Sequence, residues 1–204
     1  MKKKMSGRVF KVFSYLPVIF RAIWNQLLYR FRLGSFGFFS FIERGANIVG
    51  GKGISIGKMV HIERNSKMWC IFQYGANSYS PNLIIGDNVR IAQNLHCTCA
   101  ESVEIGEGTS ITPNCGIFDI VHPYTDVNIN PRFANIETKP VKIGKNCLIG
   151  MNTVIHPGTQ LGNHCVVGAN SSVFGSFPDF CVIVGSPAKI VRRYDPNRKE
   201  WVRV

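Results

Sequence analysis

A repeat of six residues runs through the chain from Ile143 to Pro178. Every sixth position is Ile, Leu or Val, four of the six repeats have Gly next, and the fifth position is small in five of them. An amphipathic helix would need apolar residues about every 3.6 positions, and a half-buried strand every second position. A period of six fits neither, and predicts a solenoid in which each repeat forms one short strand and one turn.

The expected structure is a three-sided parallel β-helix. The aliphatic residue of each repeat would point toward the axis with the small fifth residue beside it, and Gly or Asn would take the turn positions that need a positive φ. One repeat buries little surface alone, so coils must stack to form a core. Further repeats begin at Ile56, Ile62, Ile85, Ile91, Ile105 and Ile111.

The repeat stops between residues 119 and 140 and restarts at Val141. Insertions in repeat folds map to one face, often the binding face, so we expect a protruding functional loop. Residues 73–82 are turn-rich and predict a loop or a distorted coil. The chain then divides into a basic amphipathic N-terminal segment (1–33), the β-helix (34–187), and a C-terminal helix with a basic tail (188–204).

The net charge of +12 lies entirely at the two ends of the chain. Residues 1–33 carry eight Lys or Arg and no acidic residue, residues 189–204 carry a net +4, and the middle is neutral. Nucleic-acid binding proteins more often carry their charge as a patch on the folded body, so we expect no nucleic-acid partner. The seven cysteines include no CxxC pair, and Cys115, Cys147 and Cys165 occupy the inward fifth position as small apolar residues.

Residues 1–33 combine basic and aromatic residues, and their longest uncharged run, Val12–Phe20, is too short to span a bilayer. A signal peptide is disfavoured because Arg21 follows at once without a cleavage site of small residues. One interpretation is an amphipathic helix in the membrane interface, where Lys and Arg meet anionic headgroups. The alternative is a helix that caps the β-helix or packs on a neighbouring subunit.

His122 lies in the interrupting loop and is the candidate general base. Imidazole accepts protons near neutral pH, and a loop on a rigid scaffold can present it to a substrate. Asp119 could orient its ring, and Asp126 is a second candidate for that role. The plain alternative is a solvated loop histidine. We expect no metal site, because His156 and His164 are eight residues apart and lack the spacing of a three-histidine zinc set.

The stretch Ile117-Phe-Asp-Ile-Val-His-Pro-Tyr resembles the loop motif of the hexapeptide-repeat acyltransferases, in particular the maltose, galactoside and O-antigen O-acetyltransferases. The resemblance implies a left-handed β-helix and gives His122 the role of accepting the proton of the acceptor hydroxyl. It also assigns Asn94 to the acceptor site, with His96 nearby. The backbone N–H of Met151 would face the thioester oxygen, as this chemistry requires.

The closing motif Val184-Gly-Ser-Pro-Ala-Lys resembles the end signature of the same family, which borders the coenzyme A site. The resemblance assigns Gly150 to the cofactor site and Gly168 and Ala169 to the pantetheine arm, and it places Lys189 and Arg192 near the nucleotide phosphates. A solvated basic helix end is the alternative for the last two. Two departures from the family pattern are Leu148, where Trp is frequent, and Phe174-Gly175, where Thr-Lys is frequent.

The resulting prediction is an acetyl-CoA-dependent O-acetyltransferase without a metal, which acts on a sugar hydroxyl in surface polysaccharide biosynthesis. The resemblance implies a homotrimer with sites between subunits. The basic N-terminus favours a lipid-linked glycan acceptor and a cytoplasmic protein at the inner face of the membrane. The alternatives are a small soluble acceptor, such as serine or a free sugar, and a non-catalytic hexapeptide-repeat scaffold.

Overall fold

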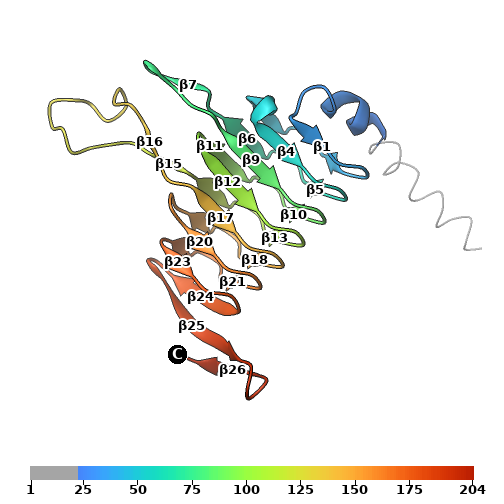
Figure 1. Cartoon of the computed structure of the whole chain (residues 1–204), viewed down its shortest axis with the longest axis vertical. Helices are drawn as coiled ribbons and strands as arrows, with labels where there is room; N and C mark the ends of the chain where they lie inside the picture. The colour runs from blue at the N-terminus through green and yellow to red at the C-terminus, as the bar shows by residue number, and fades with distance from the viewer. Residues whose placement is uncertain (1–22) are drawn as a thin grey trace, which may run out of the picture.

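The computed structural model describes residues 23–204, which form a three-sided, left-handed parallel β-helix (Figure 1). The predicted fold is therefore confirmed. In each coil the chain passes through three sheets, named A, B and C in the order in which it visits them. The three turns of a coil form the A–B, B–C and C–A corners of the prism.

The three sheets contain the following strands, in spatial order. Sheet A has β1 (Ser35–Phe36), β4 (Ile54–Ile56), β9 (Asn82–Ile85), β12 (Ser102–Ile105), β17 (Val141–Ile143), β20 (Gln160–Leu161) and β23 (Ser176–Phe177). Sheet B has β2 (Phe41–Ile42), β5 (His61–Ile62), β10 (Arg90–Ile91), β13 (Ser110–Ile111), β18 (Leu148–Ile149), β21 (Val166–Val167), β24 (Cys181–Gly185), β25 (Ala188–Asp195) and β26 (Glu200–Arg203). Sheet C has β3 (Asn47–Val49), β6 (Lys67–Cys70), β11 (His96–Cys99), β14 (Gly116–Phe118), β19 (Val154–Ile155) and β22 (Ser172–Val173).

The core is a set of stacked aliphatic columns, as the six-residue period predicts. In sheet B, Ile111 pairs with Ile149, Ile149 with Val167, and Val167 with Ile183, and all four side chains are buried. Burial of one such side chain contributes about 1.5–3 kcal/mol. The small fifth residues, Thr153, Thr159 and Ser171 among them, are buried beside these columns. All seven cysteines are likewise buried and free.

Asn and Gly have different tasks in the turns, a division that the repeat did not reveal. The third residue of each B–C turn has a positive φ, and it is Asn at Asn94, Asn114, Asn152 and Asn170. The Gly that opens a turn serves close approach instead. A Cβ on Gly150 would lie 2.5 Å from the amide nitrogen of Ala169 in the next coil.

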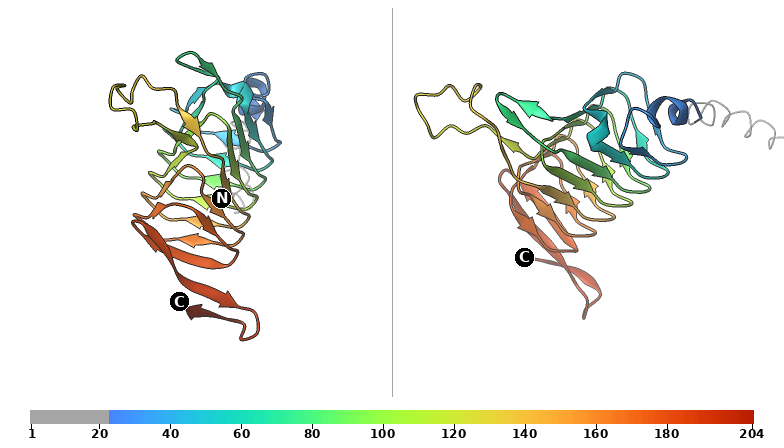
Figure 2. Two further views of the ribbon diagram at one scale, coloured as in Figure 1. Left: turned by 60° about the vertical axis from the view of Figure 1, so that its left-hand side comes forward. Right: turned by 45° about the horizontal axis from the view of Figure 1, so that its top comes forward.

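Two insertions leave the prism at the C–A corner, as Figure 2 shows. Between β6 and β9 lies the antiparallel hairpin of β7 (Gln73–Tyr74) and β8 (Asn77–Ser78). Between β14 and β17 lies the long loop 119–140, closed at its base by β15 (Ile120–Val121) and β16 (Glu137–Thr138). A short 3-10 turn, η1 (Gly51–Gly53), occupies the same corner in the first coil.

Residues 23–29 are helical and lie at the N-terminal end of the prism (Figure 1). The Asn25 side-chain oxygen accepts a hydrogen bond of 2.6 Å from the Ile42 amide, and Gln26 donates one of 2.6 Å to the Gly37 carbonyl. This part of the predicted N-terminal segment therefore caps the first coil. The rest of it, residues 1–22, lies outside the described residues.

The predicted C-terminal helix at 188–204 is wrong. The segment forms β25 and β26, which extend sheet B as antiparallel strands beyond the last coil. Sheet B continues through β24, which lies within the predicted β-helix (34–187). Ile190 lies opposite Ile183, the buried residue at the C-terminal end of the core. The segment can cover this end of the core as a strand, which favours a strand over a freely solvated helix.

Candidate active site

The candidate base lies in the long loop, directly after β15. His122 comes one residue after Val121, whose pairing with Glu137 closes the base of the loop. The imidazole of His122 is exposed, and its ring lies edge-on to the Tyr74 ring with 5.8 Å between ring centroids. His122 therefore lies on a protruding loop whose base is fixed to the prism, as the sequence predicts.

Asp119 is buried beneath this loop and is bound by the preceding coil. Its carboxylate accepts hydrogen bonds of 2.8–3.1 Å from the amides of Ala100, Glu101 and Ser102. Burial raises the pKa of the Asp119 carboxyl, and these amide hydrogen bonds act in the opposite direction. The carboxylate makes no hydrogen bond to His122 among residues 23–204, so its contacts are those of an anchor for the start of the loop.

The residues predicted for the cofactor gather at the B–C corner in consecutive coils. Gly150 approaches Gly168 and Ala169, and a Cβ on Gly168 would lie 2.8 Å from Val184. The Met151 carbonyl accepts a hydrogen bond from the Asn170 amide. The Met151 amide itself donates to no group within the described part of the chain, and the residue is exposed. This corner thus offers a narrow surface of small residues with an available N–H group.

A β-bulge places Lys189 and Arg192 on one face of sheet B. In a regular strand, residues three apart point to opposite faces. Lys189 lies opposite Val184 and Arg192 opposite Val182, while the register shift between them leaves Val191 as the extra residue. Residues directly opposite each other share a face, so both basic residues lie on the outer face, away from the buried Ile183.

Arg203 joins this basic strip, which the sequence did not reveal. It pairs with Arg192 across β25 and β26, and both residues are exposed. The available signal was the alternation Val202-Arg203-Val204 at the C-terminus, which the expectation of a helix obscured. Lys189, Arg192 and Arg203 thus form a strip of three positive charges beside Val184 and the B–C corner.

Of the two residues predicted for the acceptor, Asn94 shares the B–C corner with the predicted cofactor residues, and His96 lies on sheet C. Asn94 is a corner residue with φ 64°, and its side chain donates a 2.9 Å hydrogen bond to Asn114. Asn114 donates to Asn152, and Asn152 to Asn170, so Asn94 begins a ladder along the B–C corner. His96 lies on sheet C between the rings of Trp69 and Phe118, each 5.5 Å away.

Within one chain, the candidate base and the candidate cofactor surface lie at different corners. His122 leaves from the C–A corner, whereas Met151 and Ala169 lie at the B–C corner, and the strands of sheet C separate the two. Figure 1 shows the long loop projecting away from the coils that carry β18 and β21. The arrangement brings together the predicted cofactor residues with one another, but not with His122.

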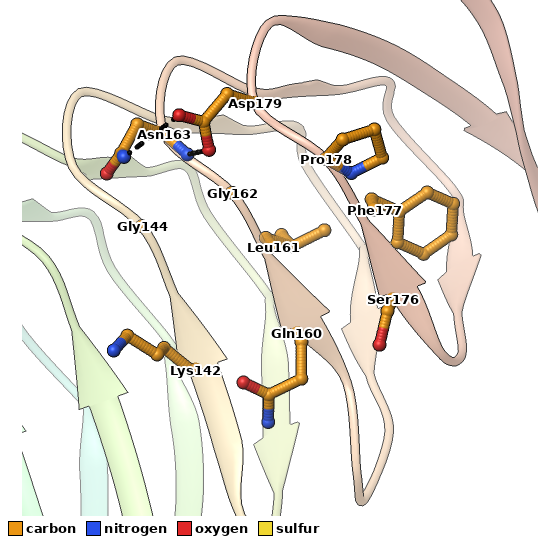
Figure 3. Close-up of a pocket in the computed structure, with 10 residues that line it drawn as sticks. All are labelled: Lys142, Gly144, Gln160, Leu161, Gly162, Asn163, Ser176, Phe177, Pro178 and Asp179. Atoms are coloured by element: carbon orange, nitrogen blue, oxygen red, sulfur yellow. Dashed lines mark hydrogen bonds between the residues drawn. The ribbon is translucent and has the colours of Figure 1, made fainter.

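A groove of about 570 Å³ lies on the outer side of sheet A and the A–B corner near the C-terminal end (Figure 3). Its lining includes Lys142, Gln160, Ser176 and Asp179, and the Asp179 carboxylate accepts hydrogen bonds from Asn163. None of the predicted site residues lines this groove. Over residues 23–204, no three His, Cys, Asp or Glu side chains are grouped so as to hold a metal ion. No helix in that range is long and apolar enough to cross a bilayer.

The sequence of this chain is similar to a known repeat family and to several transferases. Residues 140–174 match the family described as the hexapeptide repeat of succinyl-transferase. The provisionally named lipopolysaccharide biosynthesis O-acetyl transferase WbbJ of Escherichia coli is 39% identical over 58% of this chain and 64% of its own length. Galactoside O-acetyltransferase of Escherichia coli is 31% identical over 61% of this chain and 60% of its own length. The chain thus spans less than two thirds of these relatives.

A longer match and two solved structures extend this comparison. The provisionally named colanic acid biosynthesis acetyltransferase WcaF of Escherichia coli is 28% identical over 83% of this chain and 79% of its own length. A hexapeptide-repeat acetyltransferase of Vibrio cholerae superposes with a TM-score of 0.58 at 25% identity, over 85% of this chain and 81% of that one. The N-acyltransferase AntD of Bacillus cereus, at 22% identity, shares the fold over 85% of this chain and 90% of its own, with a TM-score of 0.71.

Proposed function

We propose that this chain, a hexapeptide-repeat protein related to bacterial O-acetyltransferases, transfers an acetyl group from acetyl-CoA to a sugar hydroxyl. The observation that carries the proposal is His122 on a protruding loop, together with a separate corner of small residues bordered by a basic strip. Relatives named for lipopolysaccharide and colanic acid biosynthesis support an acceptor in surface polysaccharide assembly.

The mechanism needs no nucleophile from the protein. His122 would take the proton of the acceptor hydroxyl as the oxygen attacks the thioester carbonyl, and the tetrahedral oxyanion would accept a hydrogen bond from the Met151 amide. Collapse breaks the carbon–sulfur bond, and the CoA thiolate receives a proton from the imidazolium. The exposed Met151 amide supports this role because it has no other hydrogen-bond acceptor in the described chain.

Gly150, Gly168 and Ala169 would leave room for the pantetheine arm along the B–C corner. Lys189, Arg192 and Arg203 would meet the nucleotide phosphates on the outer face of sheet B, where several cations attract an anionic group. The acceptor would lie nearer to His122. Roles for Asn94 and His96 at the acceptor then require that a neighbouring subunit brings these residues to the loop.

We also propose a homotrimer with shared sites, because His122 and the B–C corner do not meet within one chain. One subunit would supply His122 and its neighbour the surface for acetyl-CoA. Mixing experiments test this arrangement. Subunits with His122→Ala and subunits with Ala169→Phe, each inactive alone, should recover part of the activity when mixed and reassembled. Sites built within a single chain would stay inactive in every mixture.

The outer side of residues 23–31 supports contact with an anionic membrane. Trp24, Leu27 and Phe31 are more than half exposed, and Phe38 and Phe39 add apolar surface at the neighbouring corner. Lys and Arg in residues 1–33 would meet the headgroups of the inner leaflet, and we propose a cytoplasmic protein at the inner face of the membrane. In flotation with vesicles rich in phosphatidylserine, the wild type should be recovered in the upper, vesicle-containing fraction. A Trp24→Ser/Phe31→Ser variant should stay at the bottom. A wild type that stays at the bottom at low salt would exclude the contact.

The activity itself is tested by release of free CoA thiol from acetyl-CoA in the presence of sugar acceptors. We expect His122→Ala to lower kcat about 10²–10⁴-fold, the usual contribution of a general base. The matched control is His164→Asn, because His164 has φ 56° at the A–B corner and Asn tolerates that conformation. Near-full activity of His122→Ala would refute the mechanism, and a wild type that binds no acyl-CoA would favour the scaffold alternative.

A further inference from the structure

The two insertions at the C–A corner contact each other. The β7–β8 hairpin leaves the prism between β6 and β9, and the loop with His122 leaves it between β14 and β17. One intervening coil passes this corner with the short turn between β11 and β12. Figure 2 shows the hairpin and the long loop projecting on the same side of the prism. The structure therefore brings residues about 50 apart in sequence next to the candidate base.

Two tyrosines of the first insertion hold the returning limb of the second. The Tyr74 hydroxyl donates a hydrogen bond of 2.8 Å to the Arg132 carbonyl, and the Tyr79 hydroxyl donates one of 2.9 Å to the Ile136 carbonyl. The hairpin also approaches the limb closely, because a Cβ on Gly75 would lie 3.1 Å from the Asn135 side-chain oxygen. These contacts fix the side of the loop opposite to His122.

The outgoing limb of the loop meets the same hairpin through one side chain. The Tyr74 ring lies against the His122 ring at 5.8 Å between centroids and 68° between planes, an edge-to-face arrangement. Tyr74 is half-buried whereas His122 is exposed, so the tyrosine ring forms a wall on one side of the imidazole. Tyr74 is thus in contact with both limbs of the loop.

We propose that Tyr74 is a positioning residue for His122, and that the β7–β8 hairpin is the element that sets the orientation of the imidazole. A long loop closed only at its base by one short strand pair retains much conformational freedom, which must be lost before His122 can act. Misplacement of a catalytic group by about 1 Å can cost on the order of 10²-fold in rate. The hairpin removes this freedom in advance. The catalytic consequence rests on the function proposed above, whereas the positioning itself does not.

The positioning is tested without activity by nuclear magnetic resonance of the His122 ring protons, assigned by their loss in His122→Ala. Tyr74→Leu removes the ring and its ring-current shift, so the His122 signals should move and broaden. Tyr79→Phe is the matched control, because it removes one hydrogen bond to the loop but no contact to His122, and should leave the signals in place. Unchanged His122 signals in Tyr74→Leu would overturn the proposal whether or not the protein is an enzyme.

Kinetics then separate positioning from a purely structural role. Tyr74→Leu should lower kcat about 10–100-fold, as expected for a misplaced base, and Tyr74→Phe, which keeps the ring, should recover most of the loss. The KM for acetyl-CoA and the melting temperature should stay close to the wild type, because the hairpin lies outside the prism and away from the B–C corner. A loss of kcat explained fully by a lower melting temperature would overturn the proposal. Full activity of His122→Ala would refute the proposed function and leave the resonance result valid.

Discussion

Both carboxylate oxygens of Asp119 accept hydrogen bonds from the backbone amide of Ala100, at 2.9 and 3.1 Å. Asp119 also accepts from the amides of Glu101 and Ser102, at the point where the preceding coil enters β12 of sheet A. The residue that the sequence suggested as a partner of His122 therefore joins two coils at the point where the long loop begins.

Replacement of Asp119 by Asn should destabilise the protein. One acceptor oxygen becomes an NH₂ donor that faces amide donors, and a buried donor without an acceptor costs about 1–3 kcal/mol. The free energy of unfolding from urea titration measures the loss. Asp126→Asn is the control, because Asp126 is exposed and its carboxylate accepts, over residues 23–204, only from Asn128 within its own loop. Unchanged stability of Asp119→Asn together with a large fall in kcat would instead favour the orienting role.

Two turn glycines should differ in the energetic cost of substitution, because Gly150 lies in close contact with the next coil whereas Gly175 has a positive φ. Ala at Gly150 would force the backbones of two coils apart, because its Cβ would lie 2.5 Å from the Ala169 nitrogen, and we expect a loss of about 1–3 kcal/mol. Ala at Gly175 would meet open space and cost about 1 kcal/mol for its φ of +83° alone. Thermal unfolding compares the two variants. Equal losses would contradict the assignment of close approach to Gly150.

Affinity for coenzyme A should depend on the face of sheet B from which a cation projects. Arg192→Gln and Arg203→Gln should each weaken CoA binding about tenfold in calorimetry, since a hydrogen bond to a charged group contributes about 1.5 kcal/mol. The control Arg193→Gln should bind normally, because Arg193 lies opposite the buried Cys181 on the other face. Either Arg192 or Arg203 would contact the ribose phosphate, which dephospho-CoA lacks. Substitution of that arginine should leave the affinity for dephospho-CoA unchanged. Equal weakening by all three substitutions would indicate general charge attraction.

Stability should fall in mildly acidic solution. Burial lowers the pKa of His96, with the charge of Lys67 lowering it further, and burial also lowers the pKa of His156. Both rings bind a proton less readily in the fold than in the unfolded chain, where the histidine pKa is 6.5, so their stabilisation is complete above that pH and is lost as the pH falls below it.

The urea midpoint measured at a series of pH values on both sides of 6.5 checks this expectation. A His96→Gln/His156→Gln variant should show a flatter decline, because it lacks the two groups that bind protons only after unfolding. A decline of the same steepness in the variant would assign the pH dependence to other groups.

Much of the fold could be predicted because the six-residue period records which side chains face the axis. Ile149 and Val167 are buried in register, as the spacing requires. The C-terminal strands could not be predicted in this way, because β25 is antiparallel and covers the end of the core outside the repeat. Only pairing with β24 reveals the bulge at Val191 and the common face of Lys189 and Arg192.

The site was predicted in its parts rather than in its arrangement. The candidate base His122 could be singled out because the repeat breaks around it, and the break itself marks a loop. The contact of Tyr74 with the loop was missed because residues 73–82 have no period. Their sequence gives no sign that they contact a loop about 50 residues later. The position of Asp119 beneath the loop depends on amides from another coil, which sequence proximity to His122 conceals.

The separation of the two insertions from the B–C corner makes the molecule modular. The chain can change length at the C–A corner without altering the stacking of the coils, because β6 pairs with β11, and β11 with β14, regardless of what leaves between them. The hairpin and the long loop contact each other and should be exchanged together as one unit. Under the proposed function, grafting both together from a relative should transfer acceptor preference, whereas grafting either one alone should misplace His122.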